Sequence, residues 1–361
     1  MSATQTGAQP SPLARLRPRA GGALLSSLAA IVLALLIGAI LIIAWGANPL
    51  TAYLALLDGA FGSWNSLAET LLRAIPLTFT GLAIAIAFRG GAFNLGAEGQ
   101  LFLGATAAAF VGLALPDMPP LVVIPTMILT AALVGAFWSL VAGVLKIRFG
   151  ANELITTIML NYIAILFVSF LLRGPLQEAA GYLPQTERLA SNARFPALIE
   201  GTRLHFGFFL AILAVIGCHF ALWHTTWGFK LRVVGLNARA AFNSGYKVTA
   251  ITLSAFLVSG ALAGLAGYME VVGVQRRMIE NLSPGFGYTG IIVALLGRTN
   301  PIGVLAAAIL FAALQVGGTT MQTASGVPST LTTIIQGLVV LFVIGRGAFD
   351  FLAGRKQADK P

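Results

Sequence analysis

Charge and cysteine are scarce in this sequence. Only 9% of its 361 residues are Asp, Glu, Lys or Arg, whereas a soluble domain carries about 25% charged residues. This scarcity excludes an ordinary soluble domain. The single cysteine, Cys218, excludes a disulfide bond within the chain. Its apolar neighbours in the sequence predict that it packs as a small hydrophobic residue.

Sequence motifs of common enzymes are also missing. No Gly-x-x-x-x-Gly-Lys-Ser/Thr run occurs, so the chain is not expected to bind ATP through a P-loop. His-Glu-x-x-His, Cys-x-x-Cys and Asp-rich diphosphate motifs are absent, and the three histidines lack the spacing of metal ligands. We therefore expect no catalytic residue, no bound metal and no bound cofactor on this chain.

Long hydrophobic runs make up most of the sequence. The chain is 57% hydrophobic with a mean hydropathy of +0.88, and runs of about 20 apolar residues are long enough to cross a bilayer. The expected fold is all-α, a polytopic membrane protein with about ten transmembrane segments. The predicted segments are residues 23–45, 71–88, 97–115, 121–145, 154–172, 206–224, 248–272, 288–297, 302–316 and 331–344.

The basic residues predict the orientation of these segments. Most of the 22 Lys and Arg residues lie in the two tails or in connections that follow every second segment. The positive-inside rule then places both termini and residues 225–247 in the cytoplasm, and residues 173–205 outside. This distribution of the net charge of +10 is typical of a protein in a lipid membrane. It argues against nucleic acid as a partner.

A weak internal repeat is also visible. Segments two to five and seven to ten form two sets of four, interrupted by Gly-rich runs at 90–99 and 284–303. Paired broken segments are a pointer to the binding site of a transporter. The individual residues of the two sets do not align, so the possible repeat depends on the positions of the interruptions.

A polar, glycine-rich stretch at residues 90–100 separates the second and third segments. It contains Asn94, Glu98 and Gln100. A carboxylate at membrane depth costs about 2.5–3.5 kcal/mol on insertion scales, and irregular backbone is tolerated there only inside protein or beside water. We expect the stretch to line an internal pathway, and a short cytoplasmic turn is the alternative. For Glu270, near the end of the seventh segment, an interfacial position is favoured.

Polar residues also mark the fifth segment. Asn152 is expected to cap this helix, and Glu153 is favourable in its first turn. Thr157, Asn161 and Tyr162 recur at helical spacing and are expected on one face. A polar stripe within a span faces a partner or a cavity, so some of these residues are candidates for the pathway.

The predicted cytoplasmic segment 225–247 has the features of a short helix. It carries basic residues and no acidic ones. Asn237 can cap a helix, the alanines that follow favour one, and Gly245 can end it. A compact helix between two spans would form a docking element. The alternative is a basic loop that only maintains the topology.

Three stretches carry a family resemblance. They are Phe-Asn-Leu-Gly-Ala-Glu-Gly-Gln at 93–100, Asn-Glu-x-Ile-x-Thr-x-Met-Leu-Asn-Tyr at 152–162, and Leu-Arg-x-Val-Gly-x-Asn-x-x-Ala-Ala at 231–241. In these stretches the chain resembles permease subunits of ABC importers, in the nucleoside (basic membrane protein-linked) branch of the ribose and branched-chain amino acid permease superfamily. Sugar members of that superfamily are expected to carry an Asp-Leu-Ser-Val-Gly-like run in place of the first of these stretches.

The resemblance implies a subunit that moves nucleosides, or a related sugar-containing solute, across the bacterial inner (plasma) membrane. Implied partners are ATPase subunits that consume the ATP, a second and different permease subunit, and an extracytoplasmic substrate-binding protein. The chain would consist of a cytoplasmic tail at 1–22, one transmembrane permease domain at 23–346 and a cytoplasmic tail at 347–361. The alternative is a proton-coupled secondary transporter of a small polar solute that works through Glu98.

Two sets of candidate site residues follow from these motifs. The substrate-pathway set is Phe93, Asn94, Glu98, Gln100, Thr157 and Asn161. The ATPase-coupling set, which the resemblance implies, is Arg232, Gly235, Asn237, Ala240, Ala241 and Gly245.

Overall fold

The computed structural model describes residues 20–328 and 330–342. All regular elements of these residues are helices, which confirms the all-α prediction. The predicted tail at 347–361 and most of the tail at 1–22 lie outside the described residues. The chain divides into two units. The unit Leu50–Ser329 contains the predicted site residues and is described by itself below.

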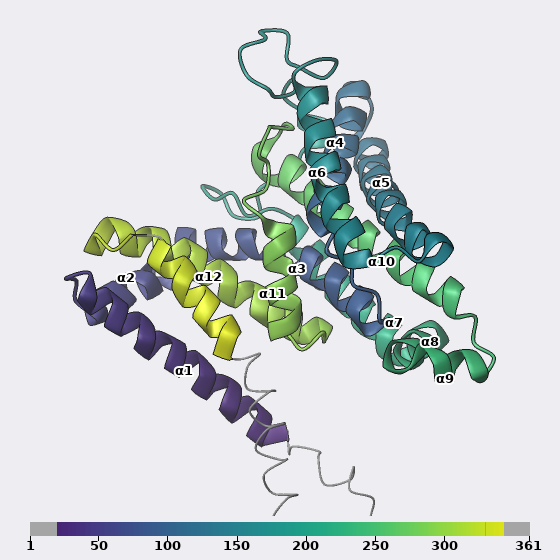
Figure 1. Cartoon of the computed structure of the whole chain (residues 1–361). Helices are drawn as coiled ribbons and strands as arrows, with labels where there is room; N and C mark the ends of the chain where they lie inside the picture. Colours follow the sequence, from purple (N-terminus) through teal and green to yellow (C-terminus); the bar gives the residue numbers. More distant parts are fainter. Residues whose placement is uncertain (1–19, 329, 343–361) are drawn as a thin grey trace, which may run out of the picture. The chain divides into compact units, whose positions relative to one another are not determined.

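The helices follow one another with short connections, except for the long loop between α6 and α7 (Figure 1). In chain order they are α1 (Ala20–Ala44), α2 (Pro49–Phe61), α3 (Trp64–Arg89), α4 (Ala97–Ala114), α5 (Pro120–Phe149), α6 (Glu153–Leu172), η2 (Ser191–Ala193), α7 (Gly207–His224), α8 (Thr226–Leu236), α9 (Ala238–Asn243), α10 (Val248–Met269), η3 (Glu270–Gln275), α11 (Phe286–Leu296) and α12 (Pro301–Ser325). A further apolar helix covers Thr330–Phe342.

Seven of the described helices are long and apolar enough to cross a membrane, or up to eight if residues 32–61 form one broken span. Each of the ten predicted segments coincides with an apolar helix, but three of these helices are not among the seven. Helices α11 and Thr330–Phe342 are too short, and α1 counts only as part of the broken span at 32–61. An 11-residue helix such as α11 is about 16 Å long, whereas the hydrocarbon core is about 30 Å thick. The structure thus supports a multi-span membrane protein without establishing ten spans.

Two segment boundaries differ from the sequence-based prediction. Helix α3 begins at Trp64, before the predicted start at residue 71, because Ser63 caps it and accepts a hydrogen bond from the Ser66 amide at 3.0 Å. Helix α12 continues to Ser325, so the predicted end of this segment at residue 316 is wrong. Gly317 and Gly318 are buried within the helix, and Gly317 lies against the backbone of α2.

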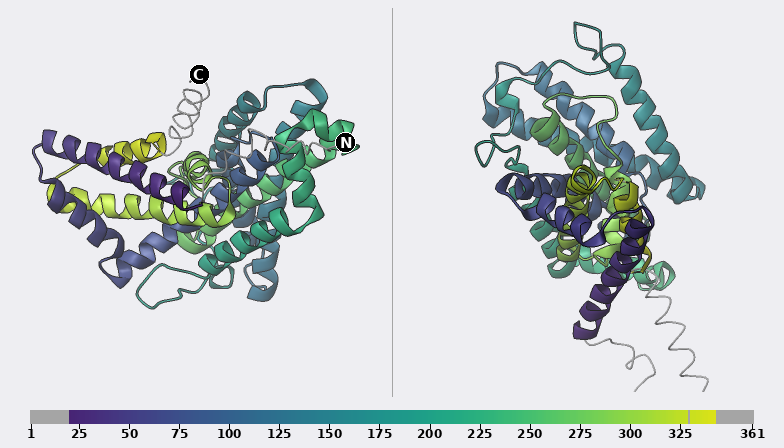
Figure 2. Two further views of the ribbon diagram at one scale, coloured as in Figure 1. Left: turned by 90° about the horizontal axis from the view of Figure 1, so that it is seen from below. Right: turned by 90° about the vertical axis from the view of Figure 1, so that its left-hand side faces the viewer.

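Helix α10 lies at the centre of this unit, where it packs against α5, α4 and α3. The Gly-x-x-x-Gly spacing of Gly260 and Gly264 is typical of close helix contacts. A Cβ atom on either glycine would overlap a backbone carbonyl oxygen of α5, and one on Gly267 would overlap the Leu101 carbonyl of α4. The glycines therefore permit backbone contact. The loop between α6 and α7 runs outside the helices (Figure 2).

Candidate functional site

The glycine-rich stretch between α3 and α4 is inserted into the helix bundle. Asn94 is 0% exposed, and its side chain reaches Ser139 of α5 and Ser259 of α10. These serines lie ten residues from the end of α5 and eleven from the start of α10, which places them about 15 Å inside at 1.5 Å per residue. Irregular backbone at this depth is enclosed by protein, as membrane-protein physics requires.

A pair of side-chain amides closes the network at the centre of this loop. Asn94 Nδ2 donates to Gln100 Oε1 and Gln100 Nε2 donates to Asn94 Oδ1, both at 3.0 Å. Asn94 Nδ2 also donates to Ser259 Oγ at 2.9 Å, and the Gly96 amide donates to Asn94 Oδ1 at 2.9 Å. Every oxygen and nitrogen of the two amide groups is therefore hydrogen-bonded to protein.

Helix α6 holds the same loop from its other side. Thr157 Oγ1 accepts from the Leu95 amide at 3.2 Å, and Asn161 Oδ1 accepts from the Gly99 amide at 2.8 Å. Asn161 Nδ2 donates back to the Leu95 carbonyl at 2.9 Å. The predicted polar stripe thus faces a partner within the chain. Tyr162 does not share this face, because it is exposed and lies a further 100° around the helix from Asn161.

The amino end of α6 anchors the start of the loop. Asn152 Oδ1 accepts from the Leu154 amide at 3.0 Å, which confirms the predicted cap. Glu153 Oε1 accepts from the Phe93 amide at 3.2 Å, and the Glu153 carboxylate forms an ion pair with Lys146 of α5. Phe93 itself is exposed, unlike the other five residues of the predicted pathway set.

Glu98 acts at the start of another helix. Its Oε2 atom accepts a hydrogen bond from the Gly287 amide, in the first turn of α11, at 2.6 Å. A carboxylate at a helix amino terminus is stabilised by the helix dipole. A Cβ atom on Gly287 would overlap the Glu98 backbone, so the contact requires glycine at this position. Ser283 completes the terminus, since its Oγ atom accepts from the amides of Gly285 and Phe286.

The segment between α7 and α10 forms two short helices, α8 and α9. Asn237 Oδ1 accepts from the Ala240 amide at 3.0 Å, and Gly245 has a φ of 81° just beyond the end of α9. The predicted cap and stop are therefore confirmed. Asn237, Ala240 and Gly245 are exposed, but Ala241 is only 1% exposed and packs within its own chain.

The exposed apolar side chains of α8 and α9 are residues that the sequence-based sets missed. Phe242 is 70% exposed and Leu236 is also exposed, although both are large and apolar. The available signal was their place among small and basic residues in a segment too polar to enter the membrane. Together they give the end of this segment an apolar surface.

The two candidate sets meet where α8 contacts the glycines at the start of the loop. A Cβ atom on Gly91 would lie 3.2 Å from the Gly235 Cα atom, and one on Gly90 would lie 2.7 Å from Leu231 Cδ1. A Cβ atom on Gly235 would overlap the carbonyl oxygen of Arg89. The structure therefore brings the predicted coupling residue Gly235 against the predicted pathway loop.

Arginines reinforce this junction. The guanidinium groups of Arg232 and Arg89 lie 4.3 Å and 5.2 Å from the ring centroid of Trp223, the range of cation–π contacts. Arg89 also donates to the carbonyls of Arg298 and Thr299, in the turn between α11 and α12. The ends of α3, α7, α8 and α11 are thus connected around one tryptophan.

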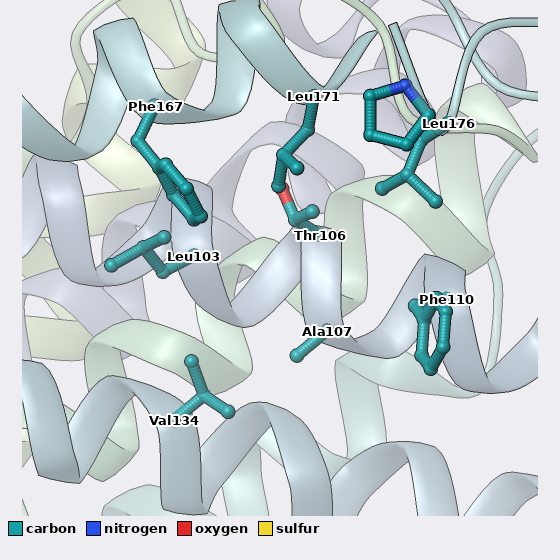
Figure 3. Close-up of a pocket in the computed structure, with 9 residues that line it drawn as sticks. Leu103, Thr106, Ala107, Phe110, Val134, Phe167, Leu171 and Leu176 are labelled. Atoms are coloured by element: carbon teal, nitrogen blue, oxygen red, sulfur yellow. The ribbon is translucent and has the colours of Figure 1, made fainter.

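An apolar crevice of about 360 Å³ lies beside α4, α5 and α6 (Figure 3). Its lining residues are Leu103, Thr106, Ala107, Phe110, Val134, Phe167, Leu171, Pro175 and Leu176. The hydroxyl of Thr106 is engaged with the Phe102 carbonyl at 2.8 Å. The crevice therefore offers no free side-chain hydrogen-bonding group to orient a polar solute, and its chemistry suits a hydrocarbon chain.

Comparison with known proteins gives a consistent result. Residues 66–344 match the family described as "Branched-chain amino acid transport system / permease component". The chain is 38% identical over 336 residues to the guanosine ABC transporter permease protein NupP of Bacillus subtilis, covering 92% of this chain and 96% of that protein. It is 34% identical to the nucleoside ABC transporter permease protein NupB of Lactococcus lactis, with coverages of 92% and 94%.

A third relative is named for a different substrate. The glucose ABC transporter permease protein TsgB13 of Haloferax volcanii is 37% identical over 324 residues, covering 87% of this chain and 85% of that protein. The resemblance found in the three sequence motifs is confirmed by these matches, which extend over most of the chain. The protein belongs to the family of permease components of the branched-chain amino acid transport system type.

Proposed function

We propose that this chain is a transmembrane permease subunit of an ABC importer that moves nucleosides, or a related sugar-containing solute, across the bacterial inner (plasma) membrane. The observation that carries the proposal is the similarity to the guanosine and nucleoside permeases over 92% of the chain. The glucose permease relative keeps sugars within the proposed class of solute.

The proposed assembly divides the work among several subunits. ATPase subunits bind and hydrolyse the ATP, a second and different permease subunit completes the membrane part, and an extracytoplasmic binding protein delivers the solute. The absence of a P-loop from the full sequence supports the assignment of ATP hydrolysis to a partner. This chain then contributes no enzymatic step and no cofactor of its own.

The proposed topology has both termini and the α8–α9 segment in the cytoplasm. It counts α1, α11 and Thr330–Phe342 together with the seven long apolar helices, which gives the ten segments expected from the sequence. The paired interruptions at 90–99 and 284–303 support a repeat of four segments, because the hydrogen bond from Gly287 to Glu98 joins the two interruptions.

The proposed route for substrate runs beside the loop at 90–100. In the present conformation the side-chain amides of Asn94, Gln100 and Asn161 are hydrogen-bonded to protein. Their role as pathway residues therefore stays a prediction, for a state in which the surrounding helices separate. Alternating access by rigid movement of helix groups is the usual transport mechanism.

The α8–α9 segment is the proposed contact for the ATPase. Phe242 provides an exposed apolar side chain for a groove in the partner, and Gly235 transmits movement to the glycines of the loop through backbone contact. Ala241, which faces its own chain, serves to hold α9 in place. Aromatic anchors of this kind commonly dominate interface energies.

The test replaces Phe242 with Asp in the complete transporter reconstituted in vesicles. Uptake and substrate-stimulated ATP hydrolysis are both expected to fall at least tenfold, with the amount of folded protein unchanged because the side chain is 70% exposed. Phe149→Asp is the matched control, because Phe149 is 74% exposed at the end of α5 on the same proposed side of the membrane. Equal effects of the two substitutions would contradict the coupling proposal.

The energy source separates this function from the proton-coupled alternative. Uptake into vesicles should require ATP and persist when a protonophore collapses the proton gradient. The hydrogen bond from Gly287 supports a structural role for Glu98, since its carboxylate already has a helix-terminal donor. Uptake that does not require ATP and that stops when the protonophore is added would favour the secondary transporter.

A further inference from the structure

A second cavity, which is polar and has a volume of about 380 Å³, lies at the carboxyl end of α10. It is bounded by the start of α3, the π-helical turn η3 and the turn that precedes α11. Its polar lining residues are Glu69, Arg73, Arg203, Glu270, Gln275, Asn281 and Ser283. Because α9 comes before α10 and the cavity residues of η3 follow it, α9 and this cavity lie at opposite ends of that helix.

Glu270 is the exceptional residue of this cavity. It is 6% exposed and lines the cavity. Its carboxylate forms no hydrogen bond or close ion pair with a residue that the structure describes, although the charges of Arg73 and Arg203 attract it and that of Glu69 repels it. Glu69 differs, because it pairs with Arg203 at 2.7 Å and with Arg73 at 3.5 Å. Buried polar groups are nearly always satisfied, so an unsatisfied one calls for a specific explanation.

A donor next to this acceptor is unsatisfied as well. The Nε atom of Arg73 is buried without a hydrogen-bond acceptor, although it lies within ion-pair distance of Glu69. Glu270 lies in a π-helical turn, a local widening of a helix that is frequent at functional sites. The cavity thus combines a carboxylate and an arginine Nε atom that form no hydrogen bond with the described residues.

The balance of charge indicates the class of ligand. Two arginines and two glutamates line the cavity, so their charges cancel and neither a cation nor an anion is favoured. A neutral solute with neighbouring hydroxyl groups fits better, because a carboxylate accepts from sugar hydroxyls, as acidic residues do with ribose in dinucleotide sites. The volume falls within the range of about 300–1,000 Å³ usual for small-molecule sites.

We propose that this cavity is an outer subsite for the sugar moiety of the transported solute. Glu270 accepts hydrogen bonds from two neighbouring hydroxyl groups, and Arg73 donates to a sugar oxygen. This inference rests on the proposed function, since it names the part of the solute that the permease recognises. Ribose in nucleosides and a free hexose share this chemistry, and the experiment distinguishes them.

The cavity is also connected to the loop at 90–100. Ser283 lines the cavity, and its hydroxyl oxygen accepts a hydrogen bond from the Phe286 amide at the start of α11. The amide of the next residue, Gly287, donates to the Glu98 carboxylate. A ligand that shifts Ser283 therefore acts on the helix terminus that Glu98 holds. The subsite is placed to pass a solute from the outer side toward the interior of the bundle.

The first experiment measures uptake by vesicles that contain the complete transporter. Labelled guanosine and labelled glucose identify the source of the sugar, and 2′-deoxyguanosine or 2-deoxyglucose removes one hydroxyl. Glu270→Gln should raise the concentration for half-maximal uptake of the hydroxylated solute at least tenfold, and that of its deoxy analogue much less. Equal shifts for both solutes, or no shift, would overturn the proposal.

Glu280→Gln is the matched control for this substitution. Glu280 is close in sequence, but its carboxylate is bound to Arg173 and Ser169, and it is not among the cavity residues. Uptake of all four solutes should stay within twofold of that of the unmodified protein. A selective loss of the hydroxylated solute with this control variant would count against a specific role for Glu270.

The second experiment measures occupancy of the cavity without transport. Gln275→Cys, in a Cys218→Ala background, places one thiol at the cavity for a maleimide added from outside. Guanosine or glucose should slow the labelling at least fivefold, and Glu270→Gln should abolish this protection. ATP-driven uptake without protection would refute the subsite and leave the proposed function intact. Protection without ATP-driven uptake would refute the proposed function and leave the subsite intact, and loss of both would refute both.

Discussion

The loop at 90–100 and the polar cavity around Glu270 are both polar regions inside an apolar bundle, but they differ in how far their hydrogen bonds are satisfied. In the loop, the amides of Asn94 and Gln100 bind each other and their neighbours. In the cavity, the carboxylate of Glu270 forms no hydrogen bond with any of the described residues. A fully satisfied buried network rigidifies a structure. An unsatisfied group retains its capacity to bind a ligand.

The largest effect is expected where the satisfied network is broken. Asn94→Leu leaves the Gln100 amide, the Ser259 hydroxyl and the Gly96 amide buried without partners. Each such group costs about 1–3 kcal/mol, so little folded protein should accumulate. The yield and the unfolding temperature in detergent measure this effect. Asn243→Leu, at an exposed position on α9, should leave both near normal.

A smaller effect is expected where α8 meets the loop. Gly235→Ala places a methyl group against the Arg89 carbonyl, and overpacking of this kind costs about 1–3 kcal/mol. Thermal unfolding should shift downward, and uptake should fall more than stability alone explains. Gly217→Ala is the matched control, because nothing lies within 4 Å of the added atom in α7. Similar losses from both substitutions would show that close contact at Gly235 is unimportant.

The third prediction concerns the pH dependence of stability that comes from His205, in the loop before α7. Burial lowers the pKa of His205 to about 4, below the unfolded value of about 6.5. Between these values the unfolded chain binds a proton that the folded chain does not, so stability present above pH 6.5 is lost as the pH falls toward 4. The slope is at most about 1.4 kcal/mol per pH unit.

The measurement compares unfolding temperatures at several pH values for the unmodified protein and for His205→Gln. The histidine ring lies against Gly273 of η3 and accepts from the Gly207 amide at 3.1 Å. His205→Gln should remove the part of the pH dependence of the unfolding temperature that comes from His205. The part that comes from the carboxylates should remain. Parallel curves for the two proteins would show that His205 does not remain neutral in the folded state.

The smallest effect contrasts the two carboxylates. Glu98→Gln weakens a hydrogen bond and a favourable charge at the amino end of α11, which should cost about 0.3–1 kcal/mol. Glu270→Gln removes a buried charge that forms no hydrogen bond with a described residue and whose desolvation outweighs the attraction of Arg73 and Arg203, so the free energy of unfolding should stay equal or rise. Thermal unfolding in detergent without solute separates the two. A larger loss from Glu270→Gln would mean that this carboxylate stabilises the fold.

Features that depend on neighbouring residues could be predicted from the sequence alone. The length of each apolar run predicted a helix at all ten positions, and the caps at Asn152 and Asn237 were identifiable because capping involves residues two or three positions apart. The Gly-x-x-x-Gly spacing on α10 indicates its close helix contacts for the same reason.

Tertiary structure decided what depends on residues far apart in the chain. The depth of the loop at 90–100 is set by Ser139 and Ser259, which lie 45 and 165 residues from Asn94. The burial of Ala241 and the helical extension through Gly317 depend on which neighbouring helix each residue meets. The free carboxylate of Glu270 could not be foreseen, because a missing partner is a property of everything that surrounds a group in space, and no local pattern encodes it.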